Sequence, residues 1–224
     1  MENKIDMWDK VKIKNVEIKN RIVRSATNEH LGSIEGIITD DYIKVYENLA
    51  KSGVGILITS HMAIDKEQRA DITHICVNER ENLDKLKLLT SVVHQYDSKI
   101  IAQISYGGHK AGNIPRQIAK TPSNTENSVA MTEEDIKECI ENYVKTVQTL
   151  KETGFDGVQL HLAHGYLLSE FLDPFYNKRI DNYGGSVDNR YRIIHKIMVA
   201  IQNIVNPVFL ITAKIDTTSK GRKS

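Results

Sequence analysis

Residues 154–192, "GFDGVQLHLAHGYLLSEFLDPFYNKRIDNYGGSVDNRYR", carry the clearest fold signal in the chain. The stretch contains an apolar run at 157–163, which is typical of a strand buried on both faces of a parallel sheet. His161, His164 and Tyr166 stand at the end of that run, just before a segment rich in Gly, Pro, Asn and Asp. Polar side chains at the carboxyl end of a buried strand are the arrangement from which (β/α) barrel enzymes build their sites.

Four other apolar runs repeat this pattern, and helical patterns lie between them. The runs cover residues 21–27, 55–61, 99–106 and 208–214, and apolar residues at helical spacing occupy 42–49, 83–93, 136–150 and 193–201. The alternation predicts an α/β fold in which right-handed crossovers join parallel strands, as either an open doubly wound sheet or a barrel.

Two observations favour the barrel over the open sheet. The turn after the first run, "NEHLGSIEG" at 28–36, lacks the G-x-G-x-x-G of a dinucleotide-binding fold. Polar residues also cluster at the predicted strand ends, among them Thr27, Asn28, Gln103 and Lys214. We therefore expect a (β/α)8 TIM-barrel type of fold that is incomplete, with about five of eight βα units in a single domain over 1–224. A hairpin at 8–21 is expected to cover the bottom of the barrel, and 107–131 shows no sustained pattern.

Composition limits the partners. The chain has 30 Lys+Arg against 29 Asp+Glu, so its net charge of +1 gives no field that would attract nucleic acid or an anionic membrane. No apolar stretch is long enough to span a membrane, and the first ten residues lack the apolar core of a signal peptide. Cys76 and Cys139 have no paired spacing and are expected to be buried packing residues. These features predict a cytoplasmic protein with a small-molecule substrate.

The two histidines allow three interpretations. A metal site would need further ligands, and the sequence has neither an H-E-x-x-H motif nor a cysteine cluster, so we predict no metal. His161 and His164 are otherwise two structural histidines or a pair of N–H donors aimed at a ligand oxygen, where each donor can contribute roughly 3 to 4 kcal/mol. Tyr166 has a phenol that keeps its proton at neutral pH, which suits a proton donor.

The same stretch resembles the signature segment of the old yellow enzyme family, the FMN-dependent NAD(P)H:flavin oxidoreductases. The resemblance rests on "HLAHGYLLSEFL" at 161–172 and "NKRIDNYGGSVDNR" at 177–190. "IKNRIVRSATNE" at 18–29 is similar to the family's flavin-contacting first strand, and "IAQISYGGHKAG" at 101–112 is similar to a segment after its third strand. The likeness covers about residues 8 to 216.

This resemblance implies an FMN site and a role for each motif residue. Backbone groups of Ser25, Ala26 and Thr27 would contact the flavin, Asn28 and Gln103 its ring oxygens and pyrimidine edge, and Lys214 the region of N1 and O2. His161 and His164 would hold a carbonyl or nitro oxygen of the substrate. Hydride would pass from NADH or NADPH through the flavin to the β-carbon of an activated alkene, and Tyr166 would protonate the α-carbon. The segment 173–192 is expected to be structural.

Two departures from the family pattern stand out. Tyr106 and His109 replace the family's His and Arg, which changes the contacts near the third strand. The chain also ends shortly after the fifth strand, whereas the family's barrel continues through three more strands whose loops hold the FMN phosphate. We therefore expect a truncated chain with open barrel edges that favour self-association.

Two alternatives to an active flavoenzyme stay open at the level of sequence. One is a non-catalytic remnant that keeps the motifs, does not bind flavin and associates with itself through its open edges. The other is a different barrel enzyme, such as an aldolase, in which Lys214 forms a Schiff base.

Overall fold

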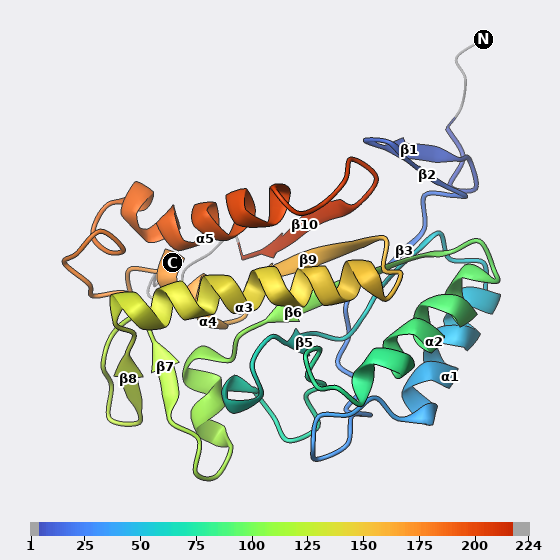
Figure 1. Cartoon of the computed structure of the whole chain (residues 1–224). Coiled ribbons are helices and arrows are strands. Elements are labelled where there is room, and N and C mark those ends of the chain that lie inside the picture. The colour runs from blue at the N-terminus through green and yellow to red at the C-terminus, as the bar shows by residue number, and fades with distance from the viewer. Residues whose placement is uncertain (1–4, 217–224) are drawn as a thin grey trace.

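The computed structural model describes residues 5–216, and its centre is a curved parallel sheet with helices on its outer face (Figure 1). The strand order is β10-β9-β6-β4-β3. Their bounds are Val23–Arg24 for β3, Ile56–Ile58 for β4, Lys99–Ser105 for β6, Gly157–Leu162 for β9 and Leu210–Ile215 for β10. All neighbouring pairs are parallel, and a short strand β5 (Met62–Ala63) pairs with the end of β6. The five predicted strands are confirmed.

Four helices follow the predicted positions. They are α1 (Asp40–Lys51), α2 (Asn82–His94), α3 (Glu133–Glu152) and α5 (Val187–Gln202). Thr39 caps α1, and Thr132 forms a capping box with Asp135 at the start of α3, because each side chain satisfies a backbone N–H that the first turn leaves free. Helix α1 packs beside α2, and α3 packs beside α5.

The two faces of the sheet have different compositions. Leu57, Ile100, Val158 and their alternate neighbours join the helices in one large buried core that extends from Ile38 to Phe209. The inner face carries a smaller apolar cluster of Ile56, Ile58, Ile101 and Leu210. This alternation follows from the two-residue repeat of strand side chains.

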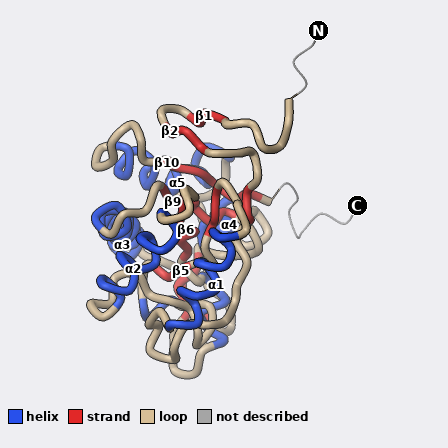
Figure 2. The backbone as a smooth tube through the Cα atoms, turned by 90° about the vertical axis from the view of Figure 1, so that its right-hand side faces the viewer, coloured by secondary structure: helices blue, strands red, loops and turns tan. Residues whose placement is uncertain are grey.

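The predicted N-terminal hairpin forms from β1 (Val11–Ile13) and β2 (Val16–Ile18), which pair antiparallel at the periphery of the molecule (Figures 1 and 2). Val16 and Ile18 are buried against the inner apolar cluster. The hairpin therefore closes that end of the curved sheet, as the sequence pattern predicted.

The structure differs from the sequence prediction in several places. The first run, expected as a strand over 21–27, keeps only Val23–Arg24, because its partner β4 offers three residues for pairing and β3 is an edge strand. The stretch 107–131, which shows no sustained pattern in the sequence, forms regular elements. They are a short helix η2 (Gly108–Asn113) and the paired strands β7 (Ala119–Thr121) and β8 (Ser128–Ala130). Two short elements, η1 (Lys66–Gln68) and α4 (Leu167–Leu172), were also not predicted.

The structure can also be compared with the predictions for the cysteines and for membrane-spanning segments. Cys76 and Cys139 are both buried and unpaired, which confirms them as packing residues. Among residues 5–216, none of the helices has the length and apolar character that a membrane crossing requires.

Candidate functional site

Strand register brings the predicted inner-face polar residues together. Gln103 of β6 lies beside Gln159 of β9, and His161 of β9 lies beside Lys214 of β10. The buried amide of Gln103 donates from Nε2 to Gln159 Oε1 at 2.8 Å. Because alternate residues share a face, these four side chains form two successive polar layers above the apolar cluster. The carboxyl ends of the strands therefore carry Gln103, His161 and Lys214, where the sequence pattern predicted polar side chains.

The turn after β9 folds Tyr166 back over His161. His164 has φ +62° and Gly165 has φ +72°, so two consecutive left-handed residues reverse the chain. Glycine adopts this conformation easily, whereas it is uncommon for a histidine and marks local strain. The ring centroids of His161 and Tyr166 are 4.5 Å apart, and those of His161 and His164 are 5.1 Å apart. All three predicted site residues thus form one cluster, which we call the His–Tyr cluster.

The members of the His–Tyr cluster differ in burial. His161 is only 3% exposed, and burial, followed by the positive charges around it, lowers its pKa to about 3. Its Nδ1 is buried and has no hydrogen-bond partner among the described residues. The His164 side chain is about half exposed, and its backbone N–H donates to Asp216 Oδ2 at 2.6 Å. The cluster therefore combines a neutral buried imidazole with one that solvent reaches.

Tyr166 is held in its protonated form. Burial, followed by the negative charge of Asp71, raises the pKa of its phenol to about 12. Lys110 of η2 places its Nζ 4.5 Å from the centre of the Tyr166 ring, in a cation–π contact. The phenol oxygen lies 3.4 Å from Nε2 of His61, a residue that was not predicted for the site.

His61 could have been found in the sequence, but its neighbours could not. It closes the apolar run 55–61 and lies three residues after the end of β4, among the polar residues that follow the predicted strands. His61 Nδ1 contacts Ser105 Oγ at 3.0 Å, and Ser105 Oγ contacts His74 Nε2 at 3.4 Å. His74 lies in the loop before α2, and no spacing in the sequence points to it.

The predicted flavin contacts in the first segment have mixed placements. Ala26 packs against the inner apolar cluster, whereas Ser25 and Thr27 are exposed. Asn28 donates from Nδ2 to Asp71 Oδ2 at 3.2 Å, and Asp71 is the carboxylate whose charge adds to the effect of burial in raising the pKa of Tyr166. The structure does not bring Asn28 into contact with the His–Tyr cluster.

Tyr106 and His109, which replace the family's His and Arg, have different surroundings. Tyr106 points into the outer core, where it is buried and where burial raises its pKa. His109 turns to the buried Glu170 of α4: its ring Nδ1 pairs with Oε1, and its backbone N–H donates to the same oxygen at 3.0 Å. The segment that contains Lys110 is therefore tied to α4 by this pair.

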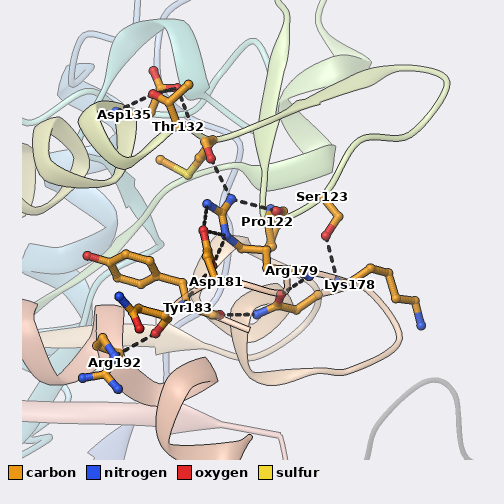
Figure 3. A network of polar contacts seen from close by, with 12 residues as sticks. Pro122, Ser123, Thr132, Asp135, Lys178, Arg179, Asp181, Tyr183 and Arg192 are labelled. Atoms are coloured by element: carbon orange, nitrogen blue, oxygen red, sulfur yellow. Dashed lines mark hydrogen bonds and ion pairs between the residues drawn. The ribbon is translucent and has the colours of Figure 1, made fainter. Parts of the chain in front are cut away.

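The loop before α5 is fixed by arginines, as expected of a structural segment. The Arg179 guanidinium donates to the carbonyl oxygens of Pro122 and Met131 at 3.0 and 2.6 Å and pairs with Asp181 (Figure 3). Arg190 donates from Nε to Leu172 O at 2.8 Å. Within the described part of the chain, no group of three or more His, Cys, Asp or Glu side chains is placed to hold a metal ion.

Comparisons with known proteins agree with this geometry. The model of the NADH:flavin oxidoreductase / NADH oxidase family matches residues 6–220. A curated NADPH dehydrogenase from Bacillus licheniformis is 34% identical over 220 residues, which cover 93% of this chain and 63% of the relative. A curated NADPH dehydrogenase from Listeria monocytogenes is 33% identical over 204 residues, covering 88% of this chain and 60% of that protein. The chain thus spans about three fifths of the length of these relatives.

Solved structures show the same fold. The old yellow enzyme from Pichia sp. superposes with a TM-score of 0.87 at 25% identity, over 92% of this chain and 59% of that one. A 2-naphthoyl-CoA reductase in complex with 2-naphthoyl-CoA gives the same TM-score and identity over 92% of this chain and 34% of its own. The curved sheet is therefore part of a TIM barrel, as the sequence predicted.

Proposed function

Because the chain belongs to the NADH:flavin oxidoreductase / NADH oxidase family, we propose that it acts, within its full-length protein, as an FMN-dependent oxidoreductase of the old yellow enzyme type. NADH or NADPH would be the reductant, and the acceptor would be a small molecule with an activated alkene or a related electrophile. The observation that carries the proposal is the His–Tyr cluster at the carboxyl ends of the strands, beside Lys214. The free, buried cysteines support a reducing location such as the cytoplasm.

The residues at the strand ends fit an FMN site. Gln103 can offer its amide to the pyrimidine edge of the ring, and Lys214 supplies positive charge on the same face, where reduction would leave negative charge. The unpartnered Nδ1 of His161 indicates that this face is completed by a group other than the described side chains. Backbone groups of Ser25, Ala26 and Thr27, with Asn28, would contact the remaining part of the ring. FMN, when bound, supplies the hydride.

The two histidines would orient and polarise the acceptor. His161 is neutral at neutral pH because burial lowers its pKa to about 3, so it acts as an N–H donor and not as a cation. The ring of His164 is about half exposed, and its centroid lies 5.1 Å from that of His161. Together they can donate to one carbonyl or nitro oxygen, which withdraws electrons from the adjacent double bond.

Tyr166 would complete the reaction as the acid. Its pKa of about 12 keeps the proton on the phenol until a carbanion develops at the α-carbon of the acceptor. Its place above His161, at 4.5 Å between ring centroids, puts the acid beside the oxygen-binding donors. The same neighbourhood therefore serves to bind the oxygen, activate the alkene and deliver the proton.

The first experiment is the visible absorption spectrum of the purified chain after excess FMN has been added and the unbound flavin removed. Retained flavin absorbance that bleaches with NADH or NADPH and returns on addition of an activated alkene is the expected result. If FMN binds to the full-length protein but not to this chain, the complete FMN site needs residues outside this chain.

A second candidate is a non-catalytic chain that associates with itself. It is favoured by one observation: within the described residues, β10 pairs with β9 on one side and has no strand on the other. An unpaired strand edge is a template for another chain. A colourless, associated protein in the same experiment would support this second candidate.

A further inference from the structure

A row of buried polar side chains stands behind Tyr166. His61 Nε2 lies 3.4 Å from Tyr166 Oη, His61 Nδ1 lies 3.0 Å from Ser105 Oγ, and Ser105 Oγ lies 3.4 Å from His74 Nε2. Each of the three residues is at most 7% exposed. The far end of the row is a main-chain group, because the Ala70 N–H donates to His74 Nδ1 at 3.0 Å. We call His61, Ser105 and His74 the buried row.

The main-chain group fixes the direction of every hydrogen bond in the buried row. A backbone N–H can only donate, so His74 Nδ1 must be an unprotonated acceptor. A neutral imidazole carries its one proton on the other nitrogen, so His74 Nε2–H donates to Ser105 Oγ. Among the described residues the Ser105 hydroxyl contacts only these two rings, so its own proton goes to His61 Nδ1. His61 then carries its proton on Nε2, which faces Tyr166.

Both rings are in the neutral state that this deduction requires. Burial lowers the pKa of His61 to about 4, with Asp71 opposing that shift and Lys110, His30 and His164 adding to it. Burial also holds the pKa of His74 well below its ordinary value. At neutral pH each ring therefore has one donor nitrogen and one acceptor nitrogen.

We propose that the buried row is a one-way chain of hydrogen bonds that holds His61 Nε2–H against Tyr166 Oη, which makes His61 a positioning residue for the proton donor. This inference rests on the role proposed above for Tyr166. Because the phenol oxygen accepts from His61, its own O–H proton is left to point away from His61, toward a substrate. When the phenol O–H bond breaks and the carbanion's electron pair takes the proton, the phenolate oxygen keeps the hydrogen bond from His61. Solvent then returns a proton to the phenolate.

The tautomers test the proposal without flavin or activity. In the full chain labelled with ¹⁵N-histidine, long-range ¹H–¹⁵N spectra at neutral pH distinguish Nδ1–H from Nε2–H rings. We expect His61 and His74 to be Nε2–H, with signals assigned through His61→Gln and His74→Gln. In Ser105→Ala, His74 should keep its tautomer because Ala70 still faces Nδ1, whereas His61 should lose its fixed one. A His61 ring that is Nδ1–H or cationic at neutral pH would overturn the proposal.

A kinetic experiment separates positioning from a structural role. In the FMN-loaded protein, His61→Phe should slow alkene reduction by about 10- to 100-fold, the effect of one hydrogen bond to a charged group, and leave flavin reduction by NADPH unchanged. His61→Gln, whose amide can still donate, should retain more activity. In a Tyr166→Phe background the His61→Phe change should have no further effect. Additive losses would contradict the proposal. Failure of both this chain and the full-length protein to bind FMN would contradict the proposed function, while the tautomers would still decide this inference.

Discussion

At the scale of single residues, Tyr166 is the most direct test of the proposed chemistry. Tyr166→Phe removes the phenol proton but keeps the ring that packs on His161. We expect alkene reduction to fall by on the order of 10² to 10⁴, because a positioned general acid contributes that much, while flavin reduction by NADPH is unchanged. Stopped-flow measurement of the two half-reactions checks this. Tyr191→Phe on α5 is the control, and equal rates in the two variants would contradict the role of Tyr166.

Three buried histidines make stability depend on pH: His61, His161 and also His74, whose pKa burial holds well below its ordinary value. The pKa of His61 is lowered to about 4 and that of His161 to about 3, from 6.5 in the unfolded chain. Between these values the unfolded state binds more protons than the native state, so stability is lost as pH falls below about 6.5. We expect His61 and His161 each to lower the free energy of unfolding by about 2 kcal/mol between pH 7 and pH 5.

Urea unfolding at several pH values measures this slope. His61→Gln removes one of these groups and should flatten the dependence, whereas His195→Gln, at an exposed position of α5, should leave it as it is. A wild-type slope in His61→Gln would mean that His61 does not resist protonation in the folded protein.

The site residues that could be predicted are those that share a local pattern. His161, His164 and Tyr166 fall within six consecutive positions, at the end of β9 and in the turn that follows, so chain geometry alone brings them together. The buried row could not be predicted, because His61 and His74 meet through a loop whose path depends on tertiary packing. Asn28 was predicted as a site residue but does not join the cluster. Strand β3 ends at Arg24, four residues before Asn28, and the Asn28 side chain donates to Asp71.

At the scale of elements, the capping box of α3 is open to a matched pair of substitutions. Thr132 accepts from the backbone N–H of Asp135 through its hydroxyl. Thr132→Ala should lower the free energy of unfolding by about 1 kcal/mol, whereas Thr132→Ser keeps the hydroxyl and should cost much less. Urea unfolding compares the two, and equal losses would show that the methyl group, and not the cap, is responsible.

The elements that could be predicted are those that are long or buried on both faces. Strands β6 and β9 read as continuous apolar runs, and α3 shows helical spacing over 20 residues. Helix α4 has six residues, fewer than two turns, so its periodicity is too short to recognise. The pairing of β7 with β8 rests on a local loop arrangement that apolar periodicity does not record.

At the scale of the whole molecule, the free side of β10 is expected to govern association. Among residues 5–216 this edge has no strand partner, and Ile215 at its end is 59% exposed. An open parallel edge with exposed apolar side chains favours pairing between chains. We therefore expect the mean mass in solution to rise with protein concentration, as measured by sedimentation equilibrium.

Ile215→Lys tests whether the edge is responsible, because a charged side chain there opposes the approach of a second strand. It should lower the mean mass, whereas Ile72→Lys, at a loop isoleucine that is 51% exposed, should not. Equal effects would assign association to general apolar exposure, and a wild-type monomer at every concentration would contradict the open-edge interpretation. If Ile215→Lys is a monomer that still retains FMN, then flavin binding belongs to the single chain, because association and the site would have been separated by one substitution.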